Sequence, residues 1–189
     1  MGINQRIKLK LNKPVIMLGM MGCGKSYVSK ALARKYGLDH YEMDEMIETS
    51  QGMSIPEIFE KYGEMHFRLL ETELLVGLLQ NNKACVISSG GGVVGRPENL
   101  QAIKDLAVSV WLKADTSILL ERVREGEGRP MLLQGDNPAA ALESLLDERK
   151  DLYAKADIHI ENNGEVDIEV LTDQLIEAII AQSNKENNK

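Results

Sequence analysis

The sequence predicts an α/β fold in which helices cover both faces of a five-stranded parallel sheet. Five short apolar segments are typical of strands, and segments with helical periodicity separate them, which is the pattern of parallel strands joined by helices. The composition, with 43% hydrophobic and 27% charged residues in a chain of 189, is that of one domain large enough to bury a core. The expected strands are residues 15–18, 40–43, 85–88, 107–112 and 157–160.

The expected helices are marked by capping residues at their ends. A helix over residues 26–36 is closed by Gly37, because glycine readily takes the left-handed conformation at a helix end. Ser54 with Glu57 three residues later is the pattern of a capping box, and Asp115 is a typical helix cap. We also expect an amphipathic helix over residues 64–79, a helix start at Pro97 and a last helix over residues 166–181.

Residues 19–26 read GMMGCGKS and match the spacing G-x-x-x-x-G-K-[ST], directly after the first expected strand. Glycines let the backbone turn its N–H groups inward around an anion, and the following helix adds its positive N-terminal end. In such a loop the lysine reaches the β- and γ-phosphates and the serine hydroxyl binds Mg²⁺. The sequence therefore predicts a nucleoside triphosphate site formed by Gly22, Cys23, Gly24, Lys25, Ser26 and Tyr27, with Mg²⁺ on Ser26.

The charge and the cysteine content bear on partners and location. A net charge of −7 argues against nucleic acid or an anionic membrane as the main partner. The sequence has no run of eighteen apolar residues and no apolar N-terminal stretch suited to a signal peptide. Two cysteines imply no disulfide framework, so we expect a cytoplasmic protein. The expected organisation is an N-terminal extension (1–12), one domain (13–182) and a flexible tail (183–189).

A segment without apolar periodicity, residues 124–137, is expected to form a mobile lid. It is rich in glycine and charge, and it is long for a connection between regular elements. Arg129 within it favours a lid over a passive surface loop, because phosphoryl transfer gains from a cation that arrives when the site closes.

Further motifs follow the phosphate loop in a fixed order. They are residues 52–59 (GMSIPEIF), 63–64, 67–68 with Glu71, the triple glycine 90–92, residues 129–130, and Arg149 with residues 152–153. The phosphate loop alone predicts only a nucleotide-binding protein, whereas the ordered set is far more specific. From residue 13 to residue 180 the set resembles the shikimate kinase family, a family of P-loop small-molecule kinases.

The resemblance implies an activity and roles for individual residues. Members of this family transfer the γ-phosphate of ATP to the 3-hydroxyl of shikimate, in the pathway to chorismate. By resemblance, Asp44 holds the hydroxyls of shikimate and orients the attacking one, while Arg68 and Arg149 clamp its carboxylate. The resemblance also implies that Gly90, Gly91 and Gly92 contact the substrate and that Arg122 packs on adenine. Lys25 and Arg129 are expected to contact the transferred phosphate. The expected protein is a monomer that uses ATP and Mg²⁺.

Physical chemistry is compatible with the clamp, although without the resemblance Arg68 would be interpreted as a member of an exposed ion pair and Arg149 as a solvated charge. A planar carboxylate suits two guanidinium groups, since each can donate two parallel hydrogen bonds. Glu71 lies three residues after Arg68 on one expected helix, so its carboxylate can orient the Arg68 side chain.

Four residues depart from the family pattern. Glu42 stands where the family has the first aspartate of an Asp-x-Asp pair, at a position associated with Mg²⁺ through water. Tyr27 replaces a common threonine, and residues 150–151 (KD) replace a small residue followed by proline. An added methylene at Glu42 can weaken a metal site that demands near-octahedral geometry. These departures leave open a related kinase that acts on another hydroxy acid, such as gluconate, or on a nucleoside monophosphate.

Two further classes of function remain as alternatives. Residues 90–95 (GGGVVG) fit the dinucleotide-binding spacing G-x-G-x-x-G, with Asp115 twenty residues beyond. That fingerprint requires a helix that opens within the glycines, whereas Pro97 begins a new helix after them. A regulatory nucleotide-binding module without turnover is disfavoured by the presence of Lys25, Ser26, Asp44 and Arg129.

Overall fold

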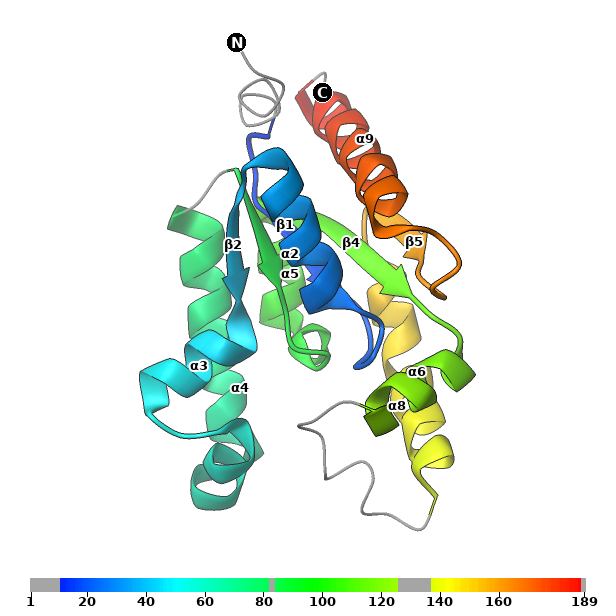
Figure 1. Cartoon of the computed structure of the whole chain (residues 1–189). Coiled ribbons are helices and arrows are strands. Elements are labelled where there is room, and N and C mark those ends of the chain that lie inside the picture. The colour runs from blue at the N-terminus through cyan, green and yellow to red at the C-terminus, as the bar shows by residue number, and fades with distance from the viewer. Residues whose placement is uncertain (1–10, 82–83, 126–136, 188–189) are drawn as a thin grey trace.

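The computed structural model describes residues 11–81, 84–125 and 137–187, and these form an α/β fold around a five-stranded sheet (Figure 1). Neighbouring strands pair in parallel throughout, in the order β2-β3-β1-β4-β5. The strands are β1 (Val15–Leu18), β2 (Asp39–Glu42), β3 (Cys85–Ser88), β4 (Val108–Lys113) and β5 (Ile158–Glu161). The predicted fold class is confirmed.

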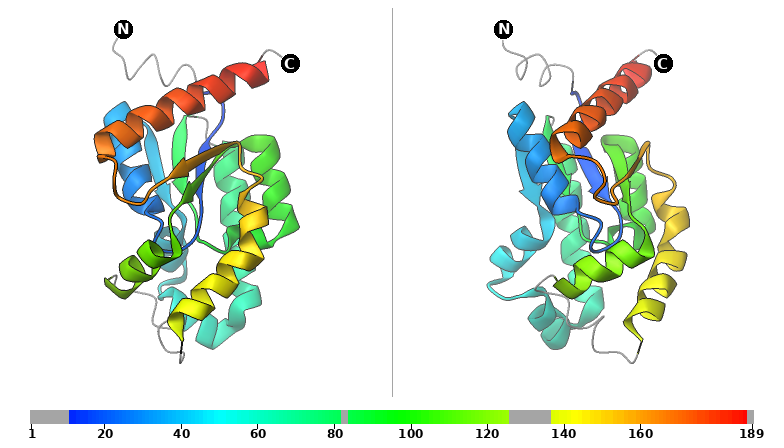
Figure 2. Two further views of the ribbon diagram at one scale, coloured as in Figure 1. Left: turned by 90° about the vertical axis from the view of Figure 1, so that its right-hand side faces the viewer. Right: turned by 45° about the vertical axis from the view of Figure 1, so that its right-hand side comes forward.

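Helices cover both faces of this sheet (Figures 1 and 2). On one face α2 (Lys25–Tyr36) packs against α9 (Ile168–Asn187), and on the other α4 (Ile55–Asn81) packs against α5 (Pro97–Leu106). The remaining helical elements are α3 (Met43–Gln51), the 3-10 helix η1 (Val93–Gly95), α6 (Thr116–Glu125) and α8 (Pro138–Tyr153).

The central strands are inaccessible because helices cover them on both sides. Every residue of β1 is at most 2% exposed, whereas the edge strands β2 and β5 read DHYE and IHIE and carry polar residues. Near-continuous apolar runs are the expected pattern of parallel strands that are buried on both faces. Because the strands run in one direction, the loops after β1, β3 and β4 converge at one end of the sheet, where α/β proteins bind ligands.

Several expected helix ends are confirmed. Gly37 has a φ of 65° and closes α2, and its N–H donates to the carbonyl of Ala33. The backbone N–H of Ser54 donates to Oε2 of Glu57 at 2.7 Å, which is one half of a capping box, and the Ser54 hydroxyl donates to the same oxygen at 2.6 Å.

The two helices expected from residue 54 and from residue 64 are both present within the element α4, on either side of Gly63, whose φ of 81° and ψ of 165° are not helical. Glycine takes this conformation without the steric cost of a Cβ. At the other end of the chain α9 continues to Asn187, so the expectation of a flexible tail from residue 183 was wrong for residues 183–187. The buried face of α9 runs on through Ile179 to Ser183, which is 1% exposed, and this burial sustains the helix.

The expected lid, residues 124–137, lies for the most part outside the described residues, which omit 126–136. The helix after that segment, α8, was not predicted. It begins where the side chain of Asn137 accepts a hydrogen bond from the N–H of Ala140 at 3.2 Å, with Pro138 at the first helical position. Both residues are typical helix-start signals. They were not interpreted as a helix start because they lie at the end of the expected lid.

Candidate active site

The phosphate loop between β1 and α2 is shaped by glycines with positive φ. Gly19, Gly22 and Gly24 have φ values of 139°, 78° and 93°, a region that favours glycine. A Cβ at Gly19 would in addition collide with the backbone oxygen of Leu112 at the end of β4. The loop therefore cannot keep this path with larger residues at these positions.

The amino end of α2 is free to bind an anion. Lys25 begins the helix after Gly24, and in the described chain no side chain caps this end and no acidic residue stands in the first turn. The first N–H groups of a helix have no partner within it, and together with the helix dipole they favour negative charge. A phosphate group meets both conditions.

The side chain of Lys25 folds back into the phosphate loop. It is 6% exposed, and Nζ donates hydrogen bonds to the carbonyl oxygens of Gly19 at 2.9 Å and Met20 at 3.0 Å. The thiol of Cys23 lies 3.9 Å from the same nitrogen. The ammonium is thus held at the centre of the loop by neutral acceptors, and anionic phosphate oxygens would make stronger hydrogen bonds with it.

Glu42, Ser26 and Ser88 form a cluster of oxygen atoms beside the loop. The pairing of β2 with β3 places Glu42 next to Ser88, whose hydroxyl is 3.4 Å from that of Ser26. Burial raises the pKa of Glu42, and hydrogen bonds from the two serine hydroxyls oppose this rise. Oε2 of Glu42 is buried and has no hydrogen-bond partner among the described residues.

This cluster fits Mg²⁺. Hydroxyl and carboxylate oxygens are ligands that Mg²⁺ accepts, and it usually keeps several waters instead of a complete protein cage. Accordingly, no group of three or more His, Cys, Asp or Glu side chains in the described chain could hold a metal ion by itself. Ser88 was not predicted, and the signal that could have found it is its place at the carboxyl end of a buried strand.

The triple glycine after β3 lets charged side chains approach the backbone closely. A Cβ on Gly90 would lie 2.8 Å from Oε1 of Glu71 and 3.0 Å from Oδ1 of Asp44, and a Cβ on Gly92 would lie 2.5 Å from Nη1 of Arg68. Neither glycine has a positive φ. Glycine is therefore required here by the close approach of these side chains.

Arg68 on α4 is held from its buried side. Its Nη1 is 2.8 Å from Oε2 of Glu71, and its Nη2 is 3.1 Å from Oε1 of Glu64. Burial raises the pKa of Glu71, and the Arg68 guanidinium opposes this rise. The expected orientation of Arg68 by Glu71 is confirmed by this geometry.

Arg149 reaches the triple glycine from α8. Its Nη1 donates to the carbonyl oxygen of Gly91 at 3.3 Å, and the hydroxyl of Tyr153, one turn further along the helix, donates to the same oxygen. Arg68 and Arg149 therefore lie against neighbouring glycines, although they come from different helices. The structure brings both arginines and Asp44 to one place.

Arg122 on α6 attaches the phosphate loop to the chain after β5. Its Nη1 donates to the carbonyl oxygens of Gly22 at 3.3 Å and Asn162 at 3.0 Å. The side chain of Asn162 in turn donates to the carbonyl of Cys23 at 2.8 Å. No motif in the sequence singled out Asn162, because its role depends on the folding of β5 beside β4.

For two other predicted site residues, the described part of the structure gives no contact with the rest of the site. Tyr27 on α2 is 65% exposed. Arg129 lies outside the described residues.

Comparison with known proteins agrees with this arrangement. The family model described as "SKI: Shikimate kinase" matches residues 21–180. The chain belongs to the shikimate kinase family. A shikimate kinase from Ruegeria pomeroyi is 42% identical over 174 residues, which cover 92% of this chain and 88% of the relative. A shikimate kinase from Thermodesulfovibrio yellowstonii is 39% identical over 176 residues, or 93% and 98% of the two chains.

A solved shikimate kinase has the same fold over nearly its whole length. The structure from Acinetobacter baumannii, in complex with shikimate, matches with a TM-score of 0.86 and 32% sequence identity, and covers 94% of this chain and 97% of that one. Shikimate kinases are ATP-dependent phosphotransferases, so the predicted family, fold and enzyme class are confirmed.

The positions of the helices after β3 argue against the dinucleotide-binding alternative. Within residues 90–95 only the three-residue 3-10 helix η1 forms, and the α-helix α5 starts after them at Pro97, whereas a dinucleotide fingerprint requires an α-helix that opens within the glycines. Among the described residues, every helix is too short or too polar to cross a bilayer.

Proposed function

We propose that this chain transfers the γ-phosphoryl group of ATP to the 3-hydroxyl of shikimate, with the residues described above in distinct roles. The observation that carries the proposal is the convergence of Arg68, Arg149 and Asp44 on the triple glycine at the end of β3. β3 pairs directly with β1, so this place adjoins the phosphate loop. An acceptor bound there stands next to the phosphates.

The two arginines bind the carboxylate of the acceptor. Arg68 is oriented by Glu71 and Arg149 by the carbonyl of Gly91, so both guanidinium groups are positioned before the substrate arrives. Such preorganisation reduces the entropy cost of binding. Gly90 and Gly92 let the Asp44 and Arg68 side chains lie close to the backbone, and we assign Gly90, Gly91 and Gly92 to contact with the substrate.

Asp44 orients the attacking hydroxyl. It lies in the first turn of α3, with Oδ1 close to Gly90, and a carboxylate there can accept the hydrogen bond of a substrate hydroxyl. In phosphoryl transfer this positioning matters more than covalent chemistry does.

The phosphate loop binds ATP and the oxygen cluster holds Mg²⁺. Backbone N–H groups of Gly22, Cys23 and Gly24 surround the phosphates, and Lys25 donates to the transferred group. Ser26 would bind Mg²⁺ directly, and Glu42 would do so through water or through Oε2. When bound, Mg²⁺ neutralises phosphate charge and fixes the phosphates in line with the acceptor.

Three further residues complete the nucleotide site in this proposal. Arg122 and Tyr27 contact ATP on the outer side of the loop, and Arg129 supplies a cation to the transferred phosphate when the lid closes. We also propose that the protein works as a monomer in a reducing cytoplasm. Its two cysteines, both buried and free, support that location.

A coupled assay of ADP release tests the proposal. Shikimate, quinate, gluconate and nucleoside monophosphates are offered in turn with Mg-ATP, and Lys25→Met is run beside the parent. We expect turnover with shikimate at least tenfold above that with any other acceptor, and little with the variant. Faster turnover with gluconate or a nucleotide would overturn the choice of acceptor.

A further inference from the structure

The side chain of Tyr153, the last residue of α8, lies where the phosphate loop meets the triple glycine. It is 0% exposed and is among the largest fully buried side chains of the described chain. Its hydroxyl donates to the carbonyl oxygen of Gly91 in the triple glycine and lies 3.7 Å from the sulfur of Met20 in the phosphate loop. One hydroxyl group therefore contacts both segments.

The backbone of the triple glycine also packs directly on the phosphate loop. A Cβ on Gly91 would lie 3.4 Å from the carbonyl oxygen of Gly19 and 3.5 Å from the backbone nitrogen of Met21. The two backbones are thus within van der Waals range of each other. Because close-packed interiors transmit strain, a displacement of one segment is felt by the other without an intervening side chain.

The carbonyl of Gly91 is shared between Tyr153 and Arg149. Nη1 of Arg149 donates to this oxygen at 3.3 Å, which is beyond the usual range of about 2.7–3.2 Å, so the guanidinium by itself holds the carbonyl weakly. The hydroxyl of Tyr153 is the second donor to the same oxygen. It fixes the carbonyl, and the carbonyl in turn orients the guanidinium that we assign to the carboxylate of the acceptor.

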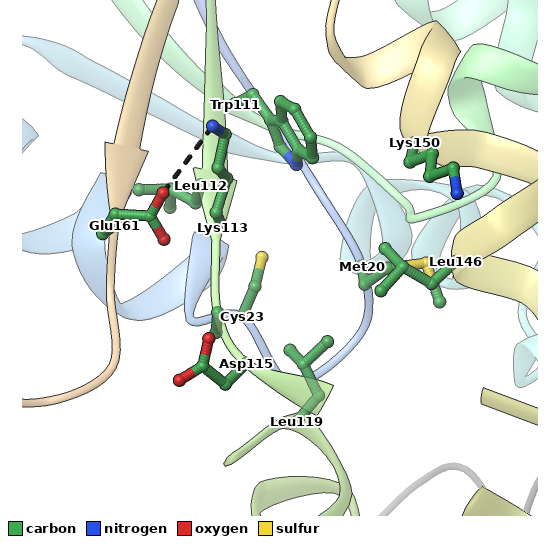
Figure 3. Close-up of a pocket in the computed structure, with 11 residues that line it drawn as sticks. Met20, Cys23, Trp111, Leu112, Lys113, Asp115, Leu119, Leu146, Lys150 and Glu161 are labelled. Carbon is green, nitrogen blue, oxygen red and sulfur yellow. Dashed lines mark ion pairs between the residues drawn. The ribbon is translucent and has the colours of Figure 1, made fainter. Parts of the chain in front are cut away.

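Met20 links this arrangement to the nucleotide. Its carbonyl accepts a hydrogen bond from Nζ of Lys25 at 3.0 Å, and phosphate oxygens would compete for that ammonium. Its side chain borders a pocket of about 280 Å³, between the ends of β4 and β5 and the helices α6 and α8, which Trp111 also lines (Figure 3). An unbranched thioether beside empty space changes conformation easily. A bound nucleotide can therefore move Met20 against the hydroxyl of Tyr153.

We propose that Tyr153 is a positioning residue that couples the nucleotide site to the acceptor site. Its hydroxyl holds Gly91, and with it Arg149, in a place that depends on the occupancy of the phosphate loop. A segment that one ligand has ordered costs the other ligand less to order, so a nucleotide raises the affinity for the acceptor. By linkage, the acceptor raises the affinity for the nucleotide by the same factor. The inference rests on the proposed function for the identity of the acceptor.

A matched pair of variants removes one tyrosine hydroxyl at a time. Tyr153→Phe keeps the ring that stacks on Trp111, with 5.8 Å between centroids and 26° between planes. Arg149 still donates to the glycine carbonyl in this variant, so we expect it to fold, and thermal unfolding checks this. Tyr36→Phe is the control, because the hydroxyl of Tyr36 also donates to a side chain, that of Asp173, but at the end of α2 away from the phosphate loop.

Calorimetric titration of shikimate, with and without Mg²⁺ and the unreactive ATP analogue AMP-PNP, measures the coupling. In the parent and in Tyr36→Phe the analogue should tighten shikimate binding about fivefold or more, the lower end of usual couplings. In Tyr153→Phe this factor should fall to about one. A lower melting temperature with an unchanged factor would show that Tyr153 serves stability alone, and would overturn the proposal.

Hydrogen exchange gives a second readout that needs no acceptor. The N–H of Val93 donates to the carbonyl of Gly90 at 3.2 Å, so its exchange reports opening of the triple glycine. The analogue alone should slow this exchange in the parent and in the control, and the slowing should be lost in Tyr153→Phe. Equal slowing with and without the hydroxyl, or none in the parent, would overturn the coupling. If shikimate does not bind but the slowing depends on Tyr153, the acceptor is wrong and the coupling stands.

Discussion

Arg68 and Glu71 form an ion pair in which Nη1 and Oε2 are 2.8 Å apart and the carboxylate is 1% exposed. The second partner of Arg68, Glu64, is 68% exposed and therefore exchanges readily with water. Glu71 is thus the partner that fixes the direction of the guanidinium. Removing either member of the buried pair leaves the other charge without compensation.

Arg68→Ala should destabilise the protein more than Arg149→Ala does. It leaves the buried Glu71 carboxylate without its cation, which we expect to cost about 2 kcal/mol, less than for a fully buried pair because Arg68 is 20% exposed. Urea unfolding followed by circular dichroism measures the difference. Adding Glu71→Gln to Arg68→Ala should restore most of the loss. Equal midpoints for the single and double variants would show that the stranded carboxylate is not the cause.

Both arginine variants should bind shikimate weakly while binding ATP almost normally. A lost charged hydrogen bond in a desolvated site costs roughly 1.5–3 kcal/mol, or about 10- to 100-fold in the dissociation constant. Calorimetric titration with shikimate and with Mg-ATP separates the two effects. Arg96→Ala removes an arginine that pairs with the exposed Glu98 and serves as the control. Parental shikimate affinity in either clamp variant would mean that the carboxylate binds elsewhere.

Lys25→Met should lower kcat by at least about 100-fold in a folded protein, because the lost interaction stabilises charge in the transition state. The buried methionine also loses the hydrogen bonds to Gly19 and Met20, so its melting temperature must be measured beside the rate. Turnover close to that of the parent would contradict the role of Lys25 in phosphoryl transfer.

Variants of Glu42 should change the requirement for Mg²⁺. Loss of an outer partner typically costs a metal site about 10- to 100-fold in affinity or activity, so Glu42→Gln should need at least about tenfold more Mg²⁺ for half-maximal rate. Glu42→Asp keeps the charge and should retain activity. Initial rates measured across Mg²⁺ concentrations test both variants. Three superimposable curves would show that Glu42 takes no part in metal binding.

The same residue predicts a dependence of stability on pH. Because burial raises the pKa of Glu42 in the folded protein, its contribution to stability is fully present below the unfolded pKa and is lost as pH rises through the folded pKa. Glu42→Gln, which cannot ionise, should therefore melt at a higher temperature than the parent at pH 7 without Mg²⁺. The gap should close as pH falls towards about 4.3, the ordinary pKa of glutamate. A constant gap between pH 4 and pH 7 would contradict this account.

The fold was predictable where local chemistry decides it. β1 and β3 were placed to the residue because buried parallel strands are nearly continuous apolar runs. The break between the two helices of α4 was also predictable, because Gly63 has a φ of 81° and a ψ of 165°, a conformation that interrupts a helix and that glycine adopts readily. The extension of α9 depends on the burial of Ser183, a tertiary contact that composition does not reveal.

Some residues of the candidate site could be identified from the sequence, and others could not. The phosphate loop is contiguous in sequence, so its residues could be identified directly, and family resemblance supplied Asp44, Arg68 and Arg149. Ser88 and Asn162 were missed because each acts through a neighbour brought close by strand pairing: Ser88 beside Glu42, and Asn162 through the carbonyl of Cys23. The buried Oε2 of Glu42 likewise becomes visible only once burial is known.

The uncapped amino end of α2 at Gly24 has a consequence for how long the protein survives in a cell. A ligand that binds only the folded chain stabilises it, by about 2.7 kcal/mol when its free concentration is 100 times Kd. When a starved cell consumes its ATP, that contribution is lost and a larger share of the chains unfolds and becomes open to proteases. The amount of this enzyme would then follow the energy supply of the cell, without any dedicated signal for its degradation.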